Sequence, residues 1–404
     1  MQRSAAHHSN RTSASELDWG MILVMILLML IGLYSLYFAI LNDGNGKSAA
    51  LKAIIMQLLY WGVGAGMIAF IMRFDAFQLW RLAPVAYGIG IVLLIGVLIF
   101  YNRALAASAG AKSWIAFGPV SLQPSEIVKP AFILMLSKVV ANHNRLYPEH
   151  TVHSDWLLIG KMVGVFLPVA FLIALQNDLG TLLVFIAILG GITIVSGVTW
   201  RILGPALAAA GAFGSLLLFL VTSSLGRSIL GSFGFQAYQF ARIDAWLHPG
   251  QDTSDTGYQT YQNLKAIGSG QLWGSGFGNM KVFVPVRESD MIFSVMGESF
   301  GFVGGAFLIA VYFLLLYLMI KATFKARNSF YAYIATGVVV MVLFHVFENV
   351  GMNIGLLPLT GIPLPFISQG GSSLLSNMIG VGLIMSMSYQ QQSRTFNESN
   401  DFSL

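Results

Sequence analysis

Long apolar segments separated by short polar turns run through almost the whole chain. Ten of these segments are about as long as, or longer than, the ~20 residues that a helix needs to cross the hydrocarbon core of a bilayer. They cover residues 19–41, 53–72, 80–100, 124–141, 156–175, 179–198, 202–222, 291–320, 329–350 and 370–389. The pattern therefore predicts an all-α, polytopic membrane protein with ten transmembrane helices.

One long segment, residues 223–290 between the seventh and eighth predicted spans, breaks this pattern. It is too long for a simple connection, which indicates a functional loop. Within it, "QAYQFARIDAWL" places apolar and aromatic residues at helical spacing. That spacing is typical of an amphipathic helix lying on the membrane face, and equally of a helix that caps the bundle.

A second interruption, "GMNIGLLPLTGIPLPFISQ" at residues 351–369, is apolar but contains three prolines and three glycines. Proline removes backbone donors and glycine permits close approach, so this stretch cannot form a simple helix. Irregular backbone at membrane depth is tolerated only where protein or a water-filled cavity surrounds it. We therefore expect a re-entrant segment that lines a cavity.

The composition supports a membrane protein without a separate soluble domain. Of the 404 residues, 56% are hydrophobic and 10% are charged, and the chain contains no cysteine, which excludes disulfides and cysteine-ligated metals. The first apolar run is about 22 residues long, too long for the core of a signal peptide, so we expect it to be retained. The predicted organisation is a tail at 1–18, one transmembrane domain at 19–389 containing the outer loop 223–290, and a tail at 390–404.

The distribution of basic residues predicts the orientation. An even number of spans places both termini on one side, and basic residues accumulate on the cytoplasmic side of membrane proteins. The termini and the turns on their side contain Arg3, Arg11, Arg73, Arg81, Arg145, Arg201, Lys321, Lys325, Arg327 and Arg394, against Lys47, Lys52, Arg103 and Lys112 in the short opposite turns. We therefore expect cytoplasmic termini and an extracellular 223–290 loop.

Three charges, Arg287, Glu288 and Asp290, stand directly before the eighth apolar run. From the residues alone, the ordinary interpretation of Asp290 is an N-cap that accepts backbone N–H bonds at the start of the helix. The alternative is a functional acid at the outer end of the span. Glu298 follows eight residues later on roughly the same helical face and is expected to point into the same cavity.

Charged residues also occur inside predicted spans, where they are costly unless paired. Glu126 and Lys129 lie three residues apart on one helical face, and Asp178 is the predicted third member of this buried ionic cluster. We expect a structural ion network, with a proton or substrate role as the alternative. On the ninth span, His345, Glu348 and Asn349 share a face and are expected to form interhelical hydrogen bonds and not to bind a metal.

Three segments resemble the signature regions of a known family. They are "GAKSWIAFGPVSLQPSEIVKPAFILMLSK" (110–138), "GYQTYQNLKAIGSGQLWGSGFGN" (257–279) and "NVGMNIGLLPLTGIPLPFISQGGSSLLSNMIGVGL" (349–383). They occur in the expected order in the SEDS family of shape, elongation, division and sporulation proteins, typified by RodA, FtsW and SpoVE. The segment "VPVRESDMIFSVMGE" resembles RodA of Gram-positive bacteria more than FtsW. Gln369, Gln271 and Ser275 depart from the family pattern, where Tyr, Gly and Lys are common.

The resemblance implies a peptidoglycan glycosyltransferase that polymerises lipid II, an undecaprenyl-pyrophosphate disaccharide-pentapeptide, into glycan strands at the outer face of the bacterial cytoplasmic membrane. Asp290 matches the family's essential acid and would act as the catalytic base. Cationic groups would stabilise the departing pyrophosphate. The candidates for binding the substrate or its pyrophosphate are Lys112, Trp114, Arg242, Lys265, Lys281, Arg287, Ser368 and Ser372.

The resemblance also implies partners and alternatives. A class B penicillin-binding protein, acting as transpeptidase, is the expected partner, and nucleic acid is not expected. A metal would be a hard divalent cation such as Mg²⁺ or Mn²⁺, because no cluster has zinc-type spacing. The expected role is cell elongation and rod shape. The alternatives are a division-specific polymerase, a lipid II flippase that uses the charges inside the spans, and a scaffold that only recruits a partner.

Overall fold

The computed structural model describes residues 17–401 except 43, 45, 119, 233–236, 251–254 and 325–327, and it describes the backbone alone at 108–109, 117, 120, 237–239, 255–256 and 391–401. Most of the predicted N-terminal tail, with Arg3 and Arg11, therefore lies outside the described residues. So do Lys325, Arg327 and the end of the predicted C-terminal tail.

A helix occupies the position of every predicted span. The helices are α1 (Trp19–Asn42), α2 (Gly46–Ile71), α3 (Ala76–Phe100), α5 (Pro124–Leu146), α6 (Val152–Leu175), α7 (Leu179–Val195), α8 (Trp200–Thr222), α12 (Phe293–Phe324), α13 (Ser329–Asn353) and α14 (Ser372–Asp401). Seven of the described helices, α1, α2, α3, α6, α8, α12 and α13, are long and apolar enough to cross a membrane, and α7 is a shorter apolar helix. Ten spans therefore remain a prediction.

The prediction of an all-α fold missed one small feature between α3 and α5. Helix α4 (Arg103–Ala109) is followed by a two-stranded antiparallel hairpin of β1 (Ile115–Phe117) and β2 (Val120–Leu122), with Ile115 opposite Leu122. Strands of three residues are too short to show a period-2 pattern of apolar and polar positions, so periodicity gives no signal for them.

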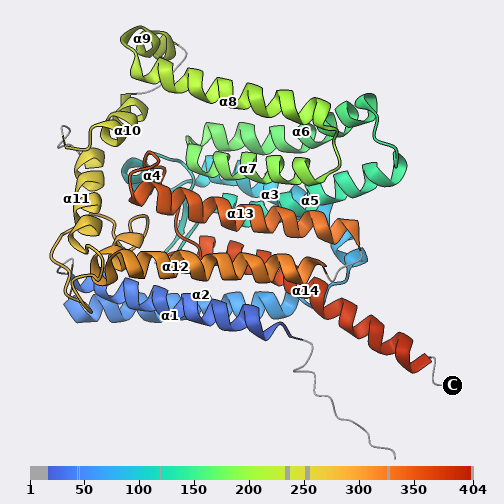
Figure 1. The fold of residues 1–404 in the computed structure, drawn as a ribbon, viewed down its shortest axis with the longest axis horizontal. Helices are drawn as coiled ribbons and strands as arrows, with labels where there is room; N and C mark the ends of the chain where they lie inside the picture. Colours follow the sequence, from blue (N-terminus) through green and yellow to red (C-terminus); the bar gives the residue numbers. More distant parts are fainter. Residues whose placement is uncertain are drawn as a thin grey trace, which may run out of the picture.

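The long helices lie side by side, and the segment between α8 and α12 covers one end of them (Figure 1). This segment contains α9 (Ser224–Ser232), α10 (Ala237–Leu247) and α11 (Asp255–Ser269), and α4 lies at the same end. Helix α1 begins and α14 terminates at the opposite end (Figure 1). The long loop predicted from the sequence is therefore a helical arm across the end of the bundle opposite the start of α1 and the end of α14.

Helix α13 is at the centre of the bundle and is the most enclosed of the seven candidate spans, whereas α8 is the least enclosed. Helix α13 packs against α5, α7, α12 and α14. This position explains why α13 tolerates polar residues. His345, Asn349 and Asn353 follow one another at four-residue spacing on one face and are buried against protein, away from lipid.

The segment after α11 packs tightly against α12. Within α12, Gly301 has a φ of 62°, so the helix is interrupted there. A Cβ on Gly301 would lie 2.6 Å from the backbone nitrogen of Gly274. Only glycine fits this conformation and this approach, and the contact holds the chain leading to Asp290 against the start of α12.

Candidate functional site

Asp290 lies at the end of the bundle covered by the helical arm. Helix α12 begins at Phe293, three residues later, so Asp290 does not occupy the N-cap position. Its Oδ1 instead accepts a hydrogen bond from the Ser289 hydroxyl at 2.8 Å. The interpretation of Asp290 as a helix cap is therefore wrong, and its carboxylate is available for another purpose.

Three neighbours and its own burial set the electrostatics of this carboxyl group. Burial raises the pKa of Asp290 to about 6, and repulsion from Glu288 acts in the same direction, while the Ser289 hydrogen bond and the charge of Arg242 oppose the rise. Arg242 comes from α10, so the helical arm brings a cation close to the acid. A carboxyl group with a pKa near the working pH can both accept and release a proton, as a general base must.

The backbone around Asp290 is held from two sides. Asn349 and Asn353 each donate a side-chain hydrogen bond to the Asp290 carbonyl oxygen, at 2.9 and 3.0 Å. The Ser368 hydroxyl donates to the Ser289 carbonyl at 2.7 Å. Ser368 is buried, so it positions the Asp290 loop, and its hydroxyl is already engaged.

The segment between α13 and α14 is irregular, as its prolines and glycines predict, and much of it is buried. It reaches the middle of two helices, because the Tyr312 hydroxyl of α12 donates to the Pro365 carbonyl and a Cβ on Gly32 of α1 would meet the Phe366 carbonyl at 3.0 Å. On its other side, Gly361 approaches Asp290, since a Cβ there would lie 3.4 Å from Asp290 Oδ2. Backbone therefore forms one wall beside the acid.

Arg287 does not have the position that phosphate binding requires. Its side chain is fully buried and forms an ion pair with Glu298, and it also donates to the Val282 carbonyl at 3.0 Å. Glu298 Oε1 in turn accepts backbone N–H bonds from Lys281 and Val282. Arg287 and Glu298 therefore hold the loop together from within, in place of the phosphate-binding role predicted for Arg287 and the cavity-facing position predicted for Glu298.

The other predicted cations belong to segments at the end of the bundle that the helical arm covers (Figure 1). Lys112 follows α4, Lys265 belongs to α11 and Lys281 precedes α12, and all three side chains are exposed. Lys112 Nζ lies 5.5 Å from the centre of the Tyr101 ring. Trp114 lies beside Lys112 in the same loop and is partly buried. The exposed amines are accessible to a phosphate, whereas Arg242 alone among these candidates acts on the pKa of Asp290.

Ser372 stands at the start of α14 and is buried. Its hydroxyl oxygen accepts the Gln123 backbone N–H at 3.0 Å. The Gln123 side chain donates to Asp178 at 2.9 Å, and Asp178 caps α7 by accepting the Thr181 backbone N–H at 3.1 Å. These contacts join the first turns of α5, α7 and α14, so Ser372 and Asp178 act here as structural links.

The buried ionic cluster forms with a different third member. Lys129 Nζ is 2.7 Å from Glu126 Oε1, as the three-residue spacing predicts, and 2.9 Å from His345 Nε2 on α13. Asp178, the predicted partner, bonds to Gln123 and Thr181 instead. Sequence spacing cannot identify His345 as the partner, because 216 residues separate it from Lys129.

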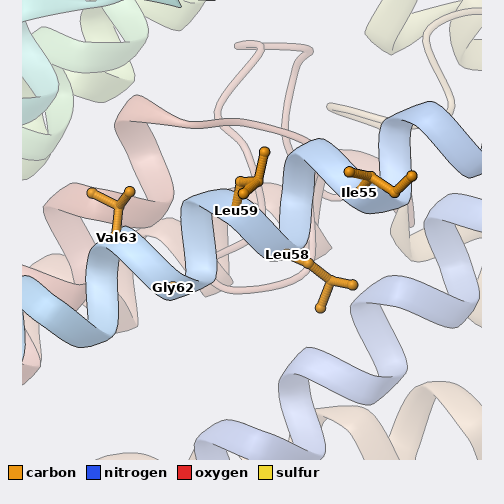
Figure 2. Close-up of a pocket in the computed structure, with 5 residues that line it drawn as sticks. All are labelled: Ile55, Leu58, Leu59, Gly62 and Val63. Carbon is orange, nitrogen blue, oxygen red and sulfur yellow. The ribbon is translucent and has the colours of Figure 1, made fainter.

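An apolar hollow of about 520 Å³ lies on the surface of α2 (Figure 2). It is lined by Ile55, Leu58, Leu59, Gly62 and Val63. The opposite face of α2 is turned inward, where Gln57 donates to the Ser368 carbonyl at 3.3 Å. The hollow has the chemistry to contact a hydrocarbon chain and contains no group that can handle a proton or a phosphate.

Within the described part of the chain, three or more His, Cys, Asp or Glu residues do not gather into a cluster that could hold a metal ion. A metal shared between a substrate phosphate and one carboxylate needs no such cluster. The carboxyl group of Asp290 and the nearby cations are therefore the groups of the protein that can take part in catalysis at this end of the molecule.

Two kinds of comparison with known proteins bear on this site. The profile of the FtsW, RodA and SpoVE proteins, described as "Cell cycle protein", matches residues 18–393. The peptidoglycan glycosyltransferase MrdB of Escherichia coli K12 is 35% identical over 310 residues, which cover 76% of this chain and 77% of that protein. The stage V sporulation protein E of Bacillus subtilis is 30% identical over 387 residues, which cover 93% and 98%.

Solved structures have the same fold. A chain from a peptidoglycan synthase complex, described as coordinating polymerization and crosslinking, aligns with a TM-score of 0.74 at 24% identity, covering 93% of this chain and 98% of that one. The rod shape determining protein RodA of Thermus thermophilus aligns with a TM-score of 0.63 at 25% identity, covering 93% and 97%.

Proposed function

Because the chain belongs to the FtsW, RodA and SpoVE family of cell cycle proteins, we propose that it is a peptidoglycan glycosyltransferase that polymerises lipid II. This membership confirms the resemblance seen in the three signature segments. The relatives named glycosyltransferases support the activity, and the multi-pass helical fold supports a membrane-embedded, polyprenyl-linked substrate.

The observation that carries the proposal is the position of Asp290. A carboxyl group with a pKa of about 6 lies within the electrostatic influence of Arg242, just before α12, which begins at the end of the bundle that the helical arm covers. In the reaction, a sugar hydroxyl of the acceptor attacks the anomeric carbon of the donor, and Asp290 accepts the hydroxyl proton. The bond from that carbon to the pyrophosphate oxygen breaks, and the polyprenyl pyrophosphate leaves as an anion.

The leaving pyrophosphate needs positive charge, and Arg242 is the best-placed source. Its charge already acts on Asp290, so a phosphate bound by Arg242 would lie beside the base. The exposed amines of Lys112, Lys265 and Lys281 belong to the same end of the molecule and are further candidates. A divalent cation such as Mg²⁺ or Mn²⁺ would be held by the substrate phosphates together with a carboxylate at this end of the molecule, and it would supply further positive charge for the departing pyrophosphate.

The topology follows from the same proposal. All ten helices at the predicted positions would span the bacterial cytoplasmic membrane, with both termini in the cytoplasm and the helical arm outside, where lipid II is used. The positive-inside distribution of Lys and Arg supports this orientation. The apolar hollow on α2 supplies a surface that polyprenyl chains can contact.

The partner would be a class B penicillin-binding protein whose transpeptidase cross-links the new strand. The fold of a chain in a peptidoglycan synthase complex supports such an assembly. Co-expression with the transpeptidase of the same organism is expected to raise the rate of polymerisation at matched protein levels. An equal rate with and without it would contradict the partnership.

The deciding experiment for the function uses purified protein, fluorescent lipid II and detergent. Glycan ladders on a gel are expected, and they require no sealed membrane. A flippase would give no ladder but would move lipid II across vesicle membranes. The ion cluster of Glu126, Lys129 and His345 keeps this second candidate open, although its side chains are buried and bonded to one another. Depletion in cells then separates elongation, which gives rounded cells, from division, which gives filaments.

A further inference from the structure

The carbonyl oxygen of Asp290 accepts two hydrogen bonds from side chains of one helix. Asn349 Nδ2 lies 2.9 Å from this oxygen and Asn353 Nδ2 lies 3.0 Å from it. Both asparagines are on α13, one turn apart, and both are fully buried. Backbone carbonyls usually find backbone partners, so two buried amides directed at the peptide of a single acid indicate a specific task.

We propose that Asn349 and Asn353 are positioning residues that hold the Asp290 peptide in place, so that its carboxylate remains at the distance proton transfer requires. This inference rests on the proposed role of Asp290 as the base. Asp290 lies in a turn outside any helix, and therefore lacks the hydrogen-bond ladder that would hold it in a regular element. The two amides replace that ladder.

The two amides also connect the peptide to the rest of the site. Asn349 donates to the Ile362 carbonyl at 2.8 Å, one residue after Gly361, which approaches the Asp290 carboxylate. One side chain therefore sets the position of the acid relative to the backbone wall beside it. Asn353 donates back to the Asn349 carbonyl at 2.8 Å, which limits its own freedom to rotate.

Helix α13 is itself anchored one turn before Asn349. His345 precedes Asn349 by four residues, and its Nε2 lies 2.9 Å from Lys129 Nζ on α5. Its Nδ1 lies 2.6 Å from the Met341 carbonyl and so carries the proton, which leaves Nε2 to accept a hydrogen bond from the lysine. The polar face of α13 thus runs from a fixed ion cluster to the peptide of the acid.

Asn353 gives the cleaner test, because its other amide contacts lie within its own helix. The Asn353→Leu substitution removes the hydrogen-bond donor and keeps the size of the side chain similar. In Asn353→Ser the hydroxyl can still bond to the Asn349 carbonyl one turn earlier but is too short to reach Asp290. The serine variant keeps the test available if the leucine variant does not fold. Asn144→Leu is the matched control, since Asn144 donates similarly to the Ser196 carbonyl at 2.7 Å but lies at the other end of α5.

Lipid II polymerisation by purified protein is measured as kcat, KM and the pH dependence of kcat/KM. Both Asn353 variants are expected to lower kcat by roughly 10-fold to 100-fold, since a misplacement of about 1 Å can cost ~100-fold, and to leave KM unchanged. A carboxylate that is no longer held in place becomes more hydrated, which lowers its pKa. The acid limb of the pH profile is therefore expected to move to a lower pH than in the wild type. Asn144→Leu is expected to keep the wild-type kcat and acid limb.

A folded Asn353→Ser protein with the wild-type kcat and the wild-type acid limb would overturn the inference. So would an equal loss of kcat in the Asn144 control. Asp290→Asn distinguishes this failure from failure of the proposed function. If Asp290→Asn retains the wild-type rate, Asp290 is not the base. If it is inactive while Asn353→Ser is fully active, only the positioning role is wrong.

Discussion

Replacing Asp290 by asparagine is expected to affect activity and stability in opposite directions. The substitution keeps the size of the side chain and removes its ability to accept a proton. Loss of a general base lowers the rate by ~100-fold or more. Polymerisation of lipid II by the purified variant, followed as glycan ladders over time, measures this loss.

The stability effect follows from the pKa of the partly buried carboxyl group of Asp290. Raising the pKa of Asp290 from 3.8 to about 6 corresponds to a cost of ~3 kcal/mol for holding the charged form in the folded protein. This is an upper limit, because the side chain is partly exposed and solvent screens its charge. The folded pKa is raised, so the contribution of Asp290 is favourable below about pH 4 and is lost as the pH rises through 6. Above pH 6, Asp290→Asn is therefore expected to unfold at a higher temperature than wild type.

Asp178→Asn is the matched control for both measurements. Asp178 is also a carboxylate close to the start of a helix, but it caps α7. Asparagine is an equally good cap, so this variant should keep its activity and change the free energy of unfolding by less than ~1 kcal/mol. Asp290→Asn protein that folds normally and makes glycan at close to the wild-type rate would refute the assignment of the base.

Three further predictions concern pH, the buried ion pair and metal ions. The kcat/KM of the wild type should fall as the pH drops through about 6, because protonated Asp290 cannot accept a proton, and a rate that stays constant between about pH 5 and pH 8 would contradict this. Arg287→Met leaves Glu298 buried without its partner and should lower the free energy of unfolding by ~3–5 kcal/mol, part of which Arg287→Met with Glu298→Gln should restore in thermal unfolding, because glutamine is neutral and its oxygen can still accept the Lys281 and Val282 N–H bonds. Activity should fall with a chelator and return with Mg²⁺ or Mn²⁺, and full activity in excess chelator would exclude a required divalent cation.

The positions of the long helices were predictable because each apolar run carries its own signal. Whether about 20 residues favour a helix in hydrocarbon depends on the composition of that run, and every predicted span coincides with a helix. The irregular backbone after α13 was predictable for a similar local reason, since proline and glycine determine the backbone conformation at their own positions. The short hairpin at Ile115–Leu122 was not, because its strands are too short to show a pattern.

The partners of the polar side chains were decided by the tertiary structure. Glu126 and Lys129 were predictable as a pair because one helical turn joins them, whereas His345 replaced Asp178 as third member because α13 packs against α5. Arg287 was expected to face a phosphate, yet the loop folds it inward onto Glu298. A charge in the sequence indicates that a partner is needed and does not identify which distant element supplies it.

Asp290 shows both contributions at one residue. The sequence by itself determined that an acid stands before the eighth apolar run, and the family resemblance gave that acid a role. Its environment comes from segments far apart in the chain: Arg242 of the helical arm, Asn349 and Asn353 of α13, and Gly361 of the irregular segment. Helix formation depends on neighbours along the chain, but the pKa and position of a carboxylate depend on what packs around it, and only the tertiary structure brings those groups together.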